Sequence, residues 1–163
     1  MTSPFFRPAL AVLVGLGLAI GLEACAPTAD MSPTASIAPA PPAPEGSLDE
    51  RIAYYAALYD VPESLIRRSI RRESGYNPRA RNGPYWGLMQ IRYDTARGMG
   101  YRGKPKGLLS ADTNLKYSAR YLANAWIVSG GDPDRAIALY AGGYFYEAKR
   151  KQVLDQLKVA DAE

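Results

Sequence analysis

Residues 73–91 read E-S-G-Y-N-P-R-A-R-N-G-P-Y-W-G-L-M-Q-I. The stretch begins at the end of a helix that we predict over 62–74, because a Gly-Tyr-Asn-Pro turn follows that helix. Residues three, four and seven apart share a face of a helix, so Glu73 would lie on the same side as Ile66 and Ile70. An acidic residue therefore ends an apolar stripe at this point of the chain.

The position of Glu73 predicts an unusual carboxyl group. Burial among apolar side chains disfavours the charged form, which raises the pKa of a carboxyl toward the range that a general acid needs. The last turn of a helix also disfavours a negative charge, because the helix dipole is negative there. The alternative is that Glu73 only forms an ion pair with an arginine at the helix end. The helix pattern alone leaves both interpretations open.

Helical patterns continue on both sides of this stretch. Ser47 and Asp60 each precede a Glu by three residues, which is the capping-box pattern at a helix start. Asp112 is predicted to cap a long helix, and the glycines of 98–110 predict a loop. No segment alternates convincingly with period two, so the fold class is all-α with at most a small irregular or β element. The predicted helices cover 47–59, 62–74, 93–97, 112–129, 132–140 and 144–158.

The N-terminal part of the chain predicts export rather than fold. Residues 9–22 form an apolar run that is too short for a typical spanning helix and typical of a signal peptide over 1–24. The run ends in Leu-Glu-Ala-Cys, which resembles a bacterial lipoprotein signal with Cys25 as the lipid attachment site. A plain secretory signal is the alternative. Residues 25–46 would be the lipidated Cys and a Pro/Ala-rich disordered tether, with a reach of roughly 60 Å.

Composition excludes several classes of chemistry. The chain has no His and a single Cys, so a Ser-His-Asp triad, a His-ligated zinc and an intramolecular disulfide are excluded. Nucleotide-binding loop motifs are missing too, and we expect no cofactor and no metal. Residues 47–163 carry 19 basic and 13 acidic side chains, which suits an anionic partner. Export favours an acidic cell-wall polymer over nucleic acid.

Further motifs follow the opening stretch in a fixed order. Its own ends are E-S-G-Y-N-P and G-L-M-Q-I, separated by eight residues. Asn114-Leu115 comes next, then Tyr121-Leu122, and A-I-A-L-Y-A-G-G closes the series at 136–143. In this order the motifs resemble the catalytic domain of bacterial lytic transglycosylases of the soluble, goose-lysozyme-like (SLT) type. The resemblance implies an α-helical lysozyme-like domain over 47–163.

The resemblance also implies a site. Glu73 would be the sole catalytic acid/base, cleaving the β-1,4 bond between N-acetylmuramic acid and N-acetylglucosamine with formation of a 1,6-anhydro ring. Ser74 would lie beside the acid, and Met89 and Gln90 would line the sugar subsites. Tyr140 would hold Glu73 through its hydroxyl. Each of these four neighbours could instead have a purely structural role.

The last motif departs from the family pattern, which usually reads A-Y-N-A-G: Tyr140 keeps the Tyr position, Ala141 replaces Asn and Gly142 replaces Ala. Ala141 stands where the family usually has Asn, so a substrate hydrogen bond of that amide is lost. Aromatic residues that flank the motifs are candidates for stacking on sugar rings: Tyr85, Trp86, Tyr93 and Tyr144.

The expected partners are peptidoglycan glycan strands and, through the lipid, a membrane. We expect a monomer that binds no nucleic acid and is anchored in the periplasm. The outer membrane is favoured, because Ala26 stands where an inner-membrane retention signal usually has Asp. Two other functions remain open. A lysozyme-like hydrolase would need a second carboxylate, for which Asp94 and Asp112 are the candidates. A catalytically inert glycan-binding module is the other.

Overall fold

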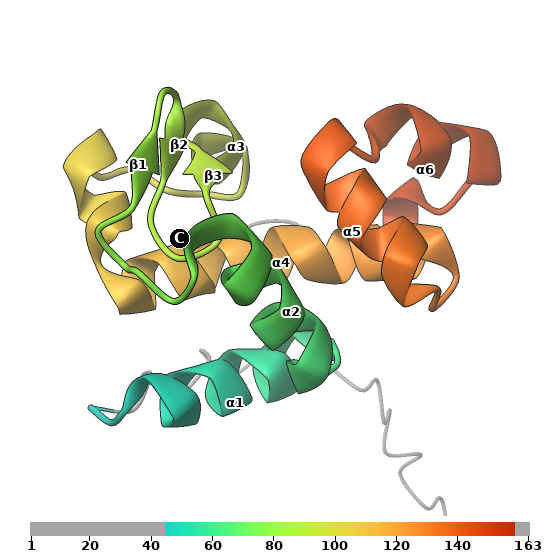
Figure 1. The fold of residues 1–163 in the computed structure, drawn as a ribbon. Coiled ribbons are helices and arrows are strands. Elements are labelled where there is room, and N and C mark those ends of the chain that lie inside the picture. Colours follow the sequence, from blue (N-terminus) through green and yellow to red (C-terminus); the bar gives the residue numbers. More distant parts are fainter. Residues whose placement is uncertain (1–44, 159–163) are drawn as a thin grey trace, which may run out of the picture. The chain divides into compact units, whose positions relative to one another are not determined.

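The computed structural model describes residues 45–158 (Figure 1). The predicted signal peptide, Cys25 and nearly all of the tether lie outside these residues. Within the described range the chain is mostly helical and carries one small sheet, which confirms the all-α, lysozyme-like fold class. No helix of this range is long and apolar enough to cross a membrane. The elements are α1 (Leu48–Tyr59), α2 (Glu63–Ser74), β1 (Arg81–Asn82), β2 (Tyr85–Trp86), β3 (Ile91–Arg92), α3 (Tyr93–Gly98), the 3₁₀ helix η1 (Pro105–Leu109), α4 (Ala111–Ser129), α5 (Pro133–Gly142), α6 (Phe145–Lys151) and the 3₁₀ helix η2 (Leu154–Gln156).

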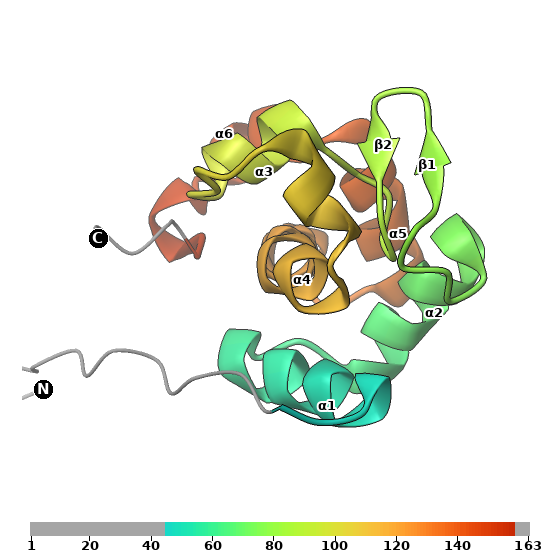
Figure 2. The ribbon, with the colours of Figure 1, turned by 90° about the vertical axis from the view of Figure 1, so that its left-hand side faces the viewer.

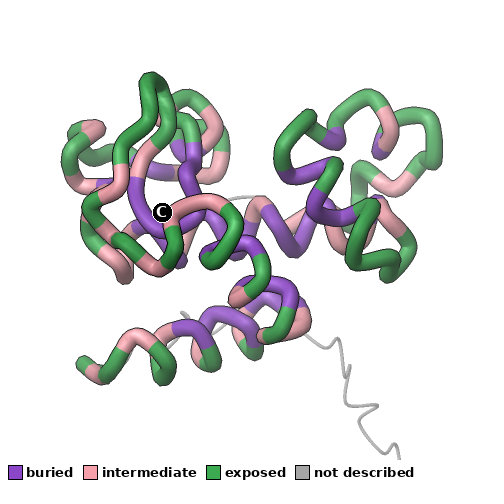
Figure 3. The backbone as a smooth tube through the Cα atoms, viewed as in Figure 1, coloured by how far each residue is buried: buried purple, intermediate pink, exposed green. Residues whose placement is uncertain are grey.

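Helix α4 is the centre of the core. It packs against α1, α5 and η1, and Figure 2 looks along its axis with α1 below it. Leu115, Ala119 and Leu122 recur along one stripe of α4 and are fully buried. In Figure 3, buried and exposed segments alternate along α1, as expected of a helix with one face on the core. The site described below is built on this packed framework.

Two helix ends confirm the sequence signals. The Ser47 hydroxyl accepts the Glu50 N–H at 3.3 Å, and the Glu50 carboxylate accepts the Ser47 N–H at 2.6 Å, which completes the predicted capping box. Gly75 and Gly130 adopt left-handed conformations directly after α2 and α4. Glycine meets that requirement without strain, so both helices end where expected.

Two predicted N-caps are wrong. Asp60 adopts a left-handed conformation (φ 50°) and ends α1, and α2 begins after Pro62 without a side-chain cap. Asp112 lies inside the first turn of α4, where the Ser110 hydroxyl accepts the Thr113 N–H instead. In both places another residue within two positions defines the helix start. An acidic residue near a helix N-terminus is favourable in the first turn as well as at the cap.

The small β element follows α2. Strands β1, β2 and β3 form an antiparallel sheet in chain order, with Arg81 opposite Trp86 and Tyr85 opposite Arg92. Each strand has only two residues, which is too short for an alternation of polar and apolar residues to be recognised in the sequence. The sheet turns the chain back from α2 toward α3.

The other departures lie in loops and near the C-terminus. The predicted loop 98–110 contains the 3₁₀ helix η1. The predicted helix 144–158 is two shorter elements, α6 and η2, because Gln152 adopts a left-handed conformation (φ 57°) that ends α6.

Candidate active site

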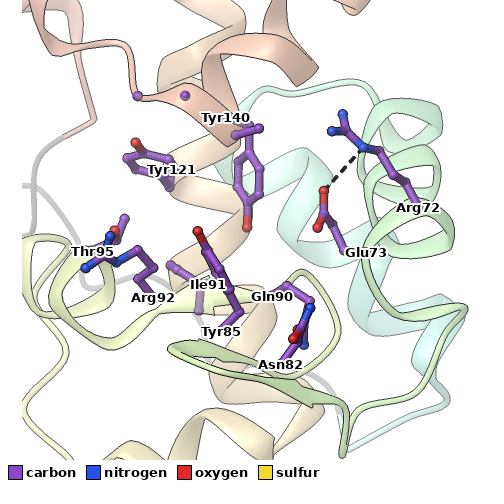
Figure 4. Close-up of a pocket in the computed structure, with 13 residues that line it drawn as sticks. Arg72, Glu73, Asn82, Tyr85, Gln90, Ile91, Arg92, Thr95, Tyr121 and Tyr140 are labelled. Atoms are coloured by element: carbon purple, nitrogen blue, oxygen red, sulfur yellow. Dashed lines mark ion pairs between the residues drawn. The ribbon is translucent and has the colours of Figure 1, made fainter.

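A cleft of about 390 Å³ opens at the C-terminal end of α2 (Figure 4). Its walls come from α2, from the segment of the sheet, and from α3, α4 and α5. It gathers a partly buried carboxyl group, three tyrosines and two amides, which is the composition of a candidate active site. The lining residues are Arg72, Glu73, Asn82, Tyr85, Gln90, Ile91, Arg92, Thr95, Tyr121, Tyr140, Ala141, Gly142 and Gly143.

Glu73 lies in the last turn of α2 with 24 % of its side chain exposed. Ile66 and Ile70 on the same face are fully buried, which confirms the predicted apolar stripe. Burial raises the pKa of Glu73, and the Arg72 guanidinium, with its Nε 3.6 Å from Glu73 Oε1, opposes this rise without cancelling it. The carboxyl group therefore lies beside an arginine and also has a raised pKa, so the contact with Arg72 does not exclude the role of a general acid, which stays a prediction.

Gln90 holds the backbone on either side of β1 and β2, at Ala80 and Gly87. Its backbone is left-handed (φ 47°), an uncommon conformation for a residue with a side chain. Its Nε2 donates to the carbonyls of Ala80 at 3.1 Å and Gly87 at 2.8 Å. Because both amide hydrogens are used on the backbone, the group that Gln90 can offer a ligand is its Oε1 acceptor.

Asn114 on α4 holds the loop between β2 and β3, residues 87–90, which we call the cleft loop. Its Oδ1 accepts the Met89 N–H at 2.9 Å, and its Nδ2 donates to the carbonyls of Trp86 at 2.8 Å and Leu108 at 2.9 Å. Gly87 lies so close to Asn114 and Leu108 that a Cβ at this position would clash with both Asn114 Nδ2 and the Leu108 carbonyl oxygen. Gly87 also has φ 71°, so glycine is required there on two grounds.

Tyr140 on α5 holds the same loop from the other side. Its hydroxyl donates to the Met89 carbonyl at 2.7 Å. The prediction that this hydroxyl holds Glu73 is therefore wrong, because the single phenolic proton is used on the backbone. Tyr140 still interacts with the acid through its charge. Burial is the main cause that raises the pKa of Tyr140, and the negative charge of Glu73 raises it further, whereas a hydrogen bond with Ser118 lowers it.

A family model described as the transglycosylase SLT domain matches residues 50–158. The match covers more than half of the chain and every residue that lines the cleft. The chain belongs to this family. As a member of this family, the chain carries an SLT domain with lytic-transglycosylase-type activity on peptidoglycan, and the glycan strands are the partner that it binds. A search of solved structures found no match.

The SLT domain does not bring every predicted site residue into the cleft. Ser74 lies outside it, and the Ser74 hydroxyl donates to the Ile70 carbonyl at 3.4 Å. The Met89 side chain is fully buried in the core, so it is a core residue whose backbone, rather than its thioether, serves the site. Glu73, Gln90 and Tyr140 do line the cleft. Ala141, where the family pattern has Asn, lies there too.

The two candidates for a second carboxylate lie elsewhere in the SLT domain. Asp112 pairs with Arg51 at 3.3 Å and accepts the Tyr55 hydroxyl at 3.0 Å, which ties α4 to α1. Asp94 does not line the cleft, and 80 % of its side chain is exposed. Glu73 is thus the only carboxylate among the described residues that line the cleft. Over 45–158, no group of three or more acidic or Cys side chains is placed to hold a metal ion.

The aromatic residues of the SLT domain divide in an unexpected way. Of the four candidates for sugar stacking, Tyr85 lines the cleft, whereas Trp86, Tyr93 and Tyr144 are not among its lining residues. Tyr121 lines it as well, with its ring 5.4 Å from that of Tyr140 in an edge-to-face arrangement. The sequence held one signal for Tyr121, because it lies seven residues after Asn114 and so on the same face of α4.

Proposed function

We propose that this domain cleaves the β-1,4 bond between N-acetylmuramic acid and N-acetylglucosamine without water and leaves a 1,6-anhydro-muramoyl end. The observation that carries the proposal is that Glu73 is the only carboxylate among the described lining residues and has a raised pKa. Most glycosidases that use water employ two carboxylates. A cleft with one carboxylate suits a reaction whose nucleophile already belongs to the substrate.

In this mechanism Glu73 acts twice. The protonated carboxyl first donates its proton to the glycosidic oxygen as the bond from that oxygen to C1 of the muramoyl residue breaks. The substrate's own acetamido group stabilises the positive charge that develops at C1. The 6-hydroxyl of the same sugar then attacks C1, and the Glu73 carboxylate takes up the hydroxyl proton. Glu73 ends protonated as it began, and no water is consumed.

The remaining cleft residues support these two steps. Gln90 offers its Oε1 acceptor to a sugar hydroxyl, since its two amide hydrogens are held by the backbone. Tyr85, with 40 % of its surface exposed, offers an aromatic face to a sugar ring. Tyr140 positions the loop that carries Gln90, through its hydrogen bond to the Met89 carbonyl. Ser74 and Met89 have structural roles in this scheme.

The product of the reaction distinguishes this proposal from its alternatives. We expect purified sacculi treated with the protein to release fragments that end in 1,6-anhydro-muramoyl residues, because attack by the tethered 6-hydroxyl has a large effective-concentration advantage over water. Intact-mass analysis measures this directly, since an anhydro end is lighter than a hydrolysed end by one water.

The other outcomes of that digest are equally specific. Fragments dominated by the heavier species, which borohydride reduces, would show a lysozyme-like hydrolase. Sacculi that retain bound protein and release no fragments would show an inert glycan-binding module. A Glu73→Gln sample processed in parallel controls for contaminating enzymes, because it should release neither product.

We further infer that the mature protein is a monomer in the periplasm, anchored by lipid on Cys25 and directed to the outer membrane. The support is the order of segments in the sequence: an apolar run over 9–22, the single Cys, and a Pro/Ala-rich tether before the domain. Stable anchoring of a protein requires two or more acyl chains or a second membrane signal, which lipoprotein processing supplies. The tether would let the domain reach glycan strands at a distance from the membrane.

Changing Cys25 to Ser is expected to move the protein from the membrane fraction to the soluble fraction. The hydroxyl of serine does not accept the thioether-linked lipid, so the anchor is lost while the domain is unaffected. Detergent-free fractionation followed by immunoblotting measures the distribution, and Ser32→Ala in the tether serves as the matched control. A Cys25→Ser protein that still sediments with membranes would place the anchor elsewhere.

A further inference from the structure

Two arginine side chains line the cleft, although the reaction itself requires no cation there. Arg72 comes from the last turn of α2, and Arg92 comes from β3. Figure 4 shows them on opposite sides of the cleft, with Tyr85, Tyr140 and Gln90 between them. Their side chains are 53 % and 54 % exposed, so a ligand can reach both guanidinium groups.

The ion pairs that these arginines make within the domain are long. Arg72 Nε lies 3.6 Å from Glu73 Oε1, and Arg92 Nη2 lies 3.7 Å from Asp94 Oδ2. Both distances exceed hydrogen-bonding range, and exposed pairs of this kind contribute little to stability. Arg67, by contrast, lies 2.5 and 2.7 Å from carboxylates of α1 and α2, which is the geometry of an arginine that stabilises the fold. The two cleft arginines therefore remain available to a ligand.

The charge of the cleft depends on the state of Glu73. The proposed reaction begins with Glu73 protonated, and in that state Arg72 loses the negative charge beside it. The described side chains that line the cleft then carry two positive charges and no negative one. A substrate that binds to this form meets a cationic surface.

Sugar rings alone do not account for such a surface, because the N-acetylated rings of the glycan are neutral. The lactyl group of muramic acid is different. It ends in a carboxylate when it is free, and when it is amidated it bears a stem peptide with carboxylates of its own. Guanidinium groups bind carboxylates through paired, charge-assisted hydrogen bonds. The muramoyl substituent is thus the part of the substrate that matches the arginines.

On the basis of the proposed function, we propose that Arg92 binds a carboxylate of the muramoyl substituent and makes the cleft select anionic strands over neutral glycans. Arg92 is a specificity-determining residue in this view, since it contacts none of the groups that transfer the proton. Arg72 adds to the same field, but its contact with Glu73 also places it beside the acid.

Binding is best measured in a Glu73→Gln background, in which the glycan stays intact and residue 73 is neutral, as in the protonated acid. Arg92→Gln and Arg92→Lys are added to this background. Arg97→Gln is the matched control, because Arg97 is an exposed arginine of the neighbouring α3 that does not line the cleft. The probes are soluble peptide-bearing strands, strands stripped of peptides by an amidase, and the neutral chitin hexasaccharide.

Arg92→Gln is expected to raise the Kd for peptide-bearing strands by about five- to tenfold at low salt, as for the loss of one charge-assisted pair. The Kd of Arg92→Lys is expected to lie between that of Arg92→Gln and that of the Glu73→Gln parent. Arg97→Gln is expected to have the parent's Kd for every probe. Binding of chitin hexasaccharide should stay within about twofold. A loss that persists on stripped strands assigns the contact to the lactyl carboxylate, and a loss confined to peptide-bearing strands assigns it to the stem peptide.

Two results would overturn the inference about Arg92. One is equal weakening of all three probes by Arg92→Gln, and the other is unchanged binding of both anionic probes. Failure of the parent Glu73→Gln protein to bind any probe would instead contradict the proposed function. The two failures are therefore distinguishable.

Discussion

Glu73→Gln is expected to lower the turnover of sacculi by about a hundredfold or more while the domain stays folded. Glutamine keeps the shape of the side chain and removes the proton that the glycosidic oxygen requires. General acid–base catalysis contributes about 10²–10⁴-fold to rates, so the loss should lie in that range. The release of soluble fragments measures turnover, and circular dichroism of the same sample verifies the helical fold.

Asp94→Asn provides the matched control for this experiment. Asp94 is a carboxylate near the cleft that does not line it, and its loss is expected to change turnover by less than about twofold. If Asp94→Asn abolished turnover as thoroughly as Glu73→Gln, two carboxylates would be needed, and the hydrolytic mechanism would be favoured instead.

Glu73→Gln is also expected to change how the stability of the domain depends on pH. Burial raises the pKa of Glu73, so the folded protein holds this proton more tightly than the unfolded chain does. The stabilisation from that proton is complete below the unfolded pKa of about 4.3 and is lost as the pH rises through the folded pKa. Glu73→Gln should therefore unfold at a higher temperature than wild type at pH 7, and the difference should shrink by pH 4. Thermal unfolding at the two pH values measures this difference.

Asn114→Ala is expected to lower the free energy of unfolding by about 3–5 kcal/mol. Three backbone groups, the Met89 N–H and the carbonyls of Trp86 and Leu108, lose their partner at once. Each buried group left unpaired costs about 1–3 kcal/mol, and the total is a large part of a typical domain's stability of about 5–15 kcal/mol. Urea unfolding of the purified domain measures the change.

Thr113→Ala, one residue earlier on α4, controls for the effect of truncating a side chain on this helix. It is expected to change stability by less than about 0.5 kcal/mol. An Asn114→Ala protein as stable as Thr113→Ala would show that the loop is held by other contacts, and the role given to Asn114 would be incorrect.

Much of the fold could be predicted because the signals for helices are local. The capping box at Ser47 and the glycines at 75 and 130 each act within a few residues, and the structure has helix ends at those places. The caps assigned to Asp60 and Asp112 were wrong. At α4 two polar residues lie close enough to cap the helix and Ser110 does so in place of Asp112, whereas α2 begins after Pro62 with no side-chain cap.

The site was less predictable, because its contacts join residues far apart in the chain. Glu73 could be proposed as the acid from its place at the end of an apolar stripe together with the order of the motifs, because the stripe alone left an ion pair equally open. The partner of the Tyr140 hydroxyl could not, since it is a backbone carbonyl 51 residues away. The role of Asn114 was hidden in the same way: an amide near a helix start has a local explanation, and only the packed structure shows that it bonds to Met89, 25 residues away.

The hydrogen bonds that hold the cleft loop share one property with a consequence for engineering. Asn114, Tyr140 and the Gln90 side chain all bond to backbone atoms of the loop or its neighbours, and to none of its side chains. The path of the loop therefore depends on few of the side chains it presents; the exceptions are Gly87, where a side chain does not fit, and Gln90, whose amide itself holds the backbone. Positions such as Tyr85 can be redesigned to accept a different glycan while the scaffold beneath them stays in place.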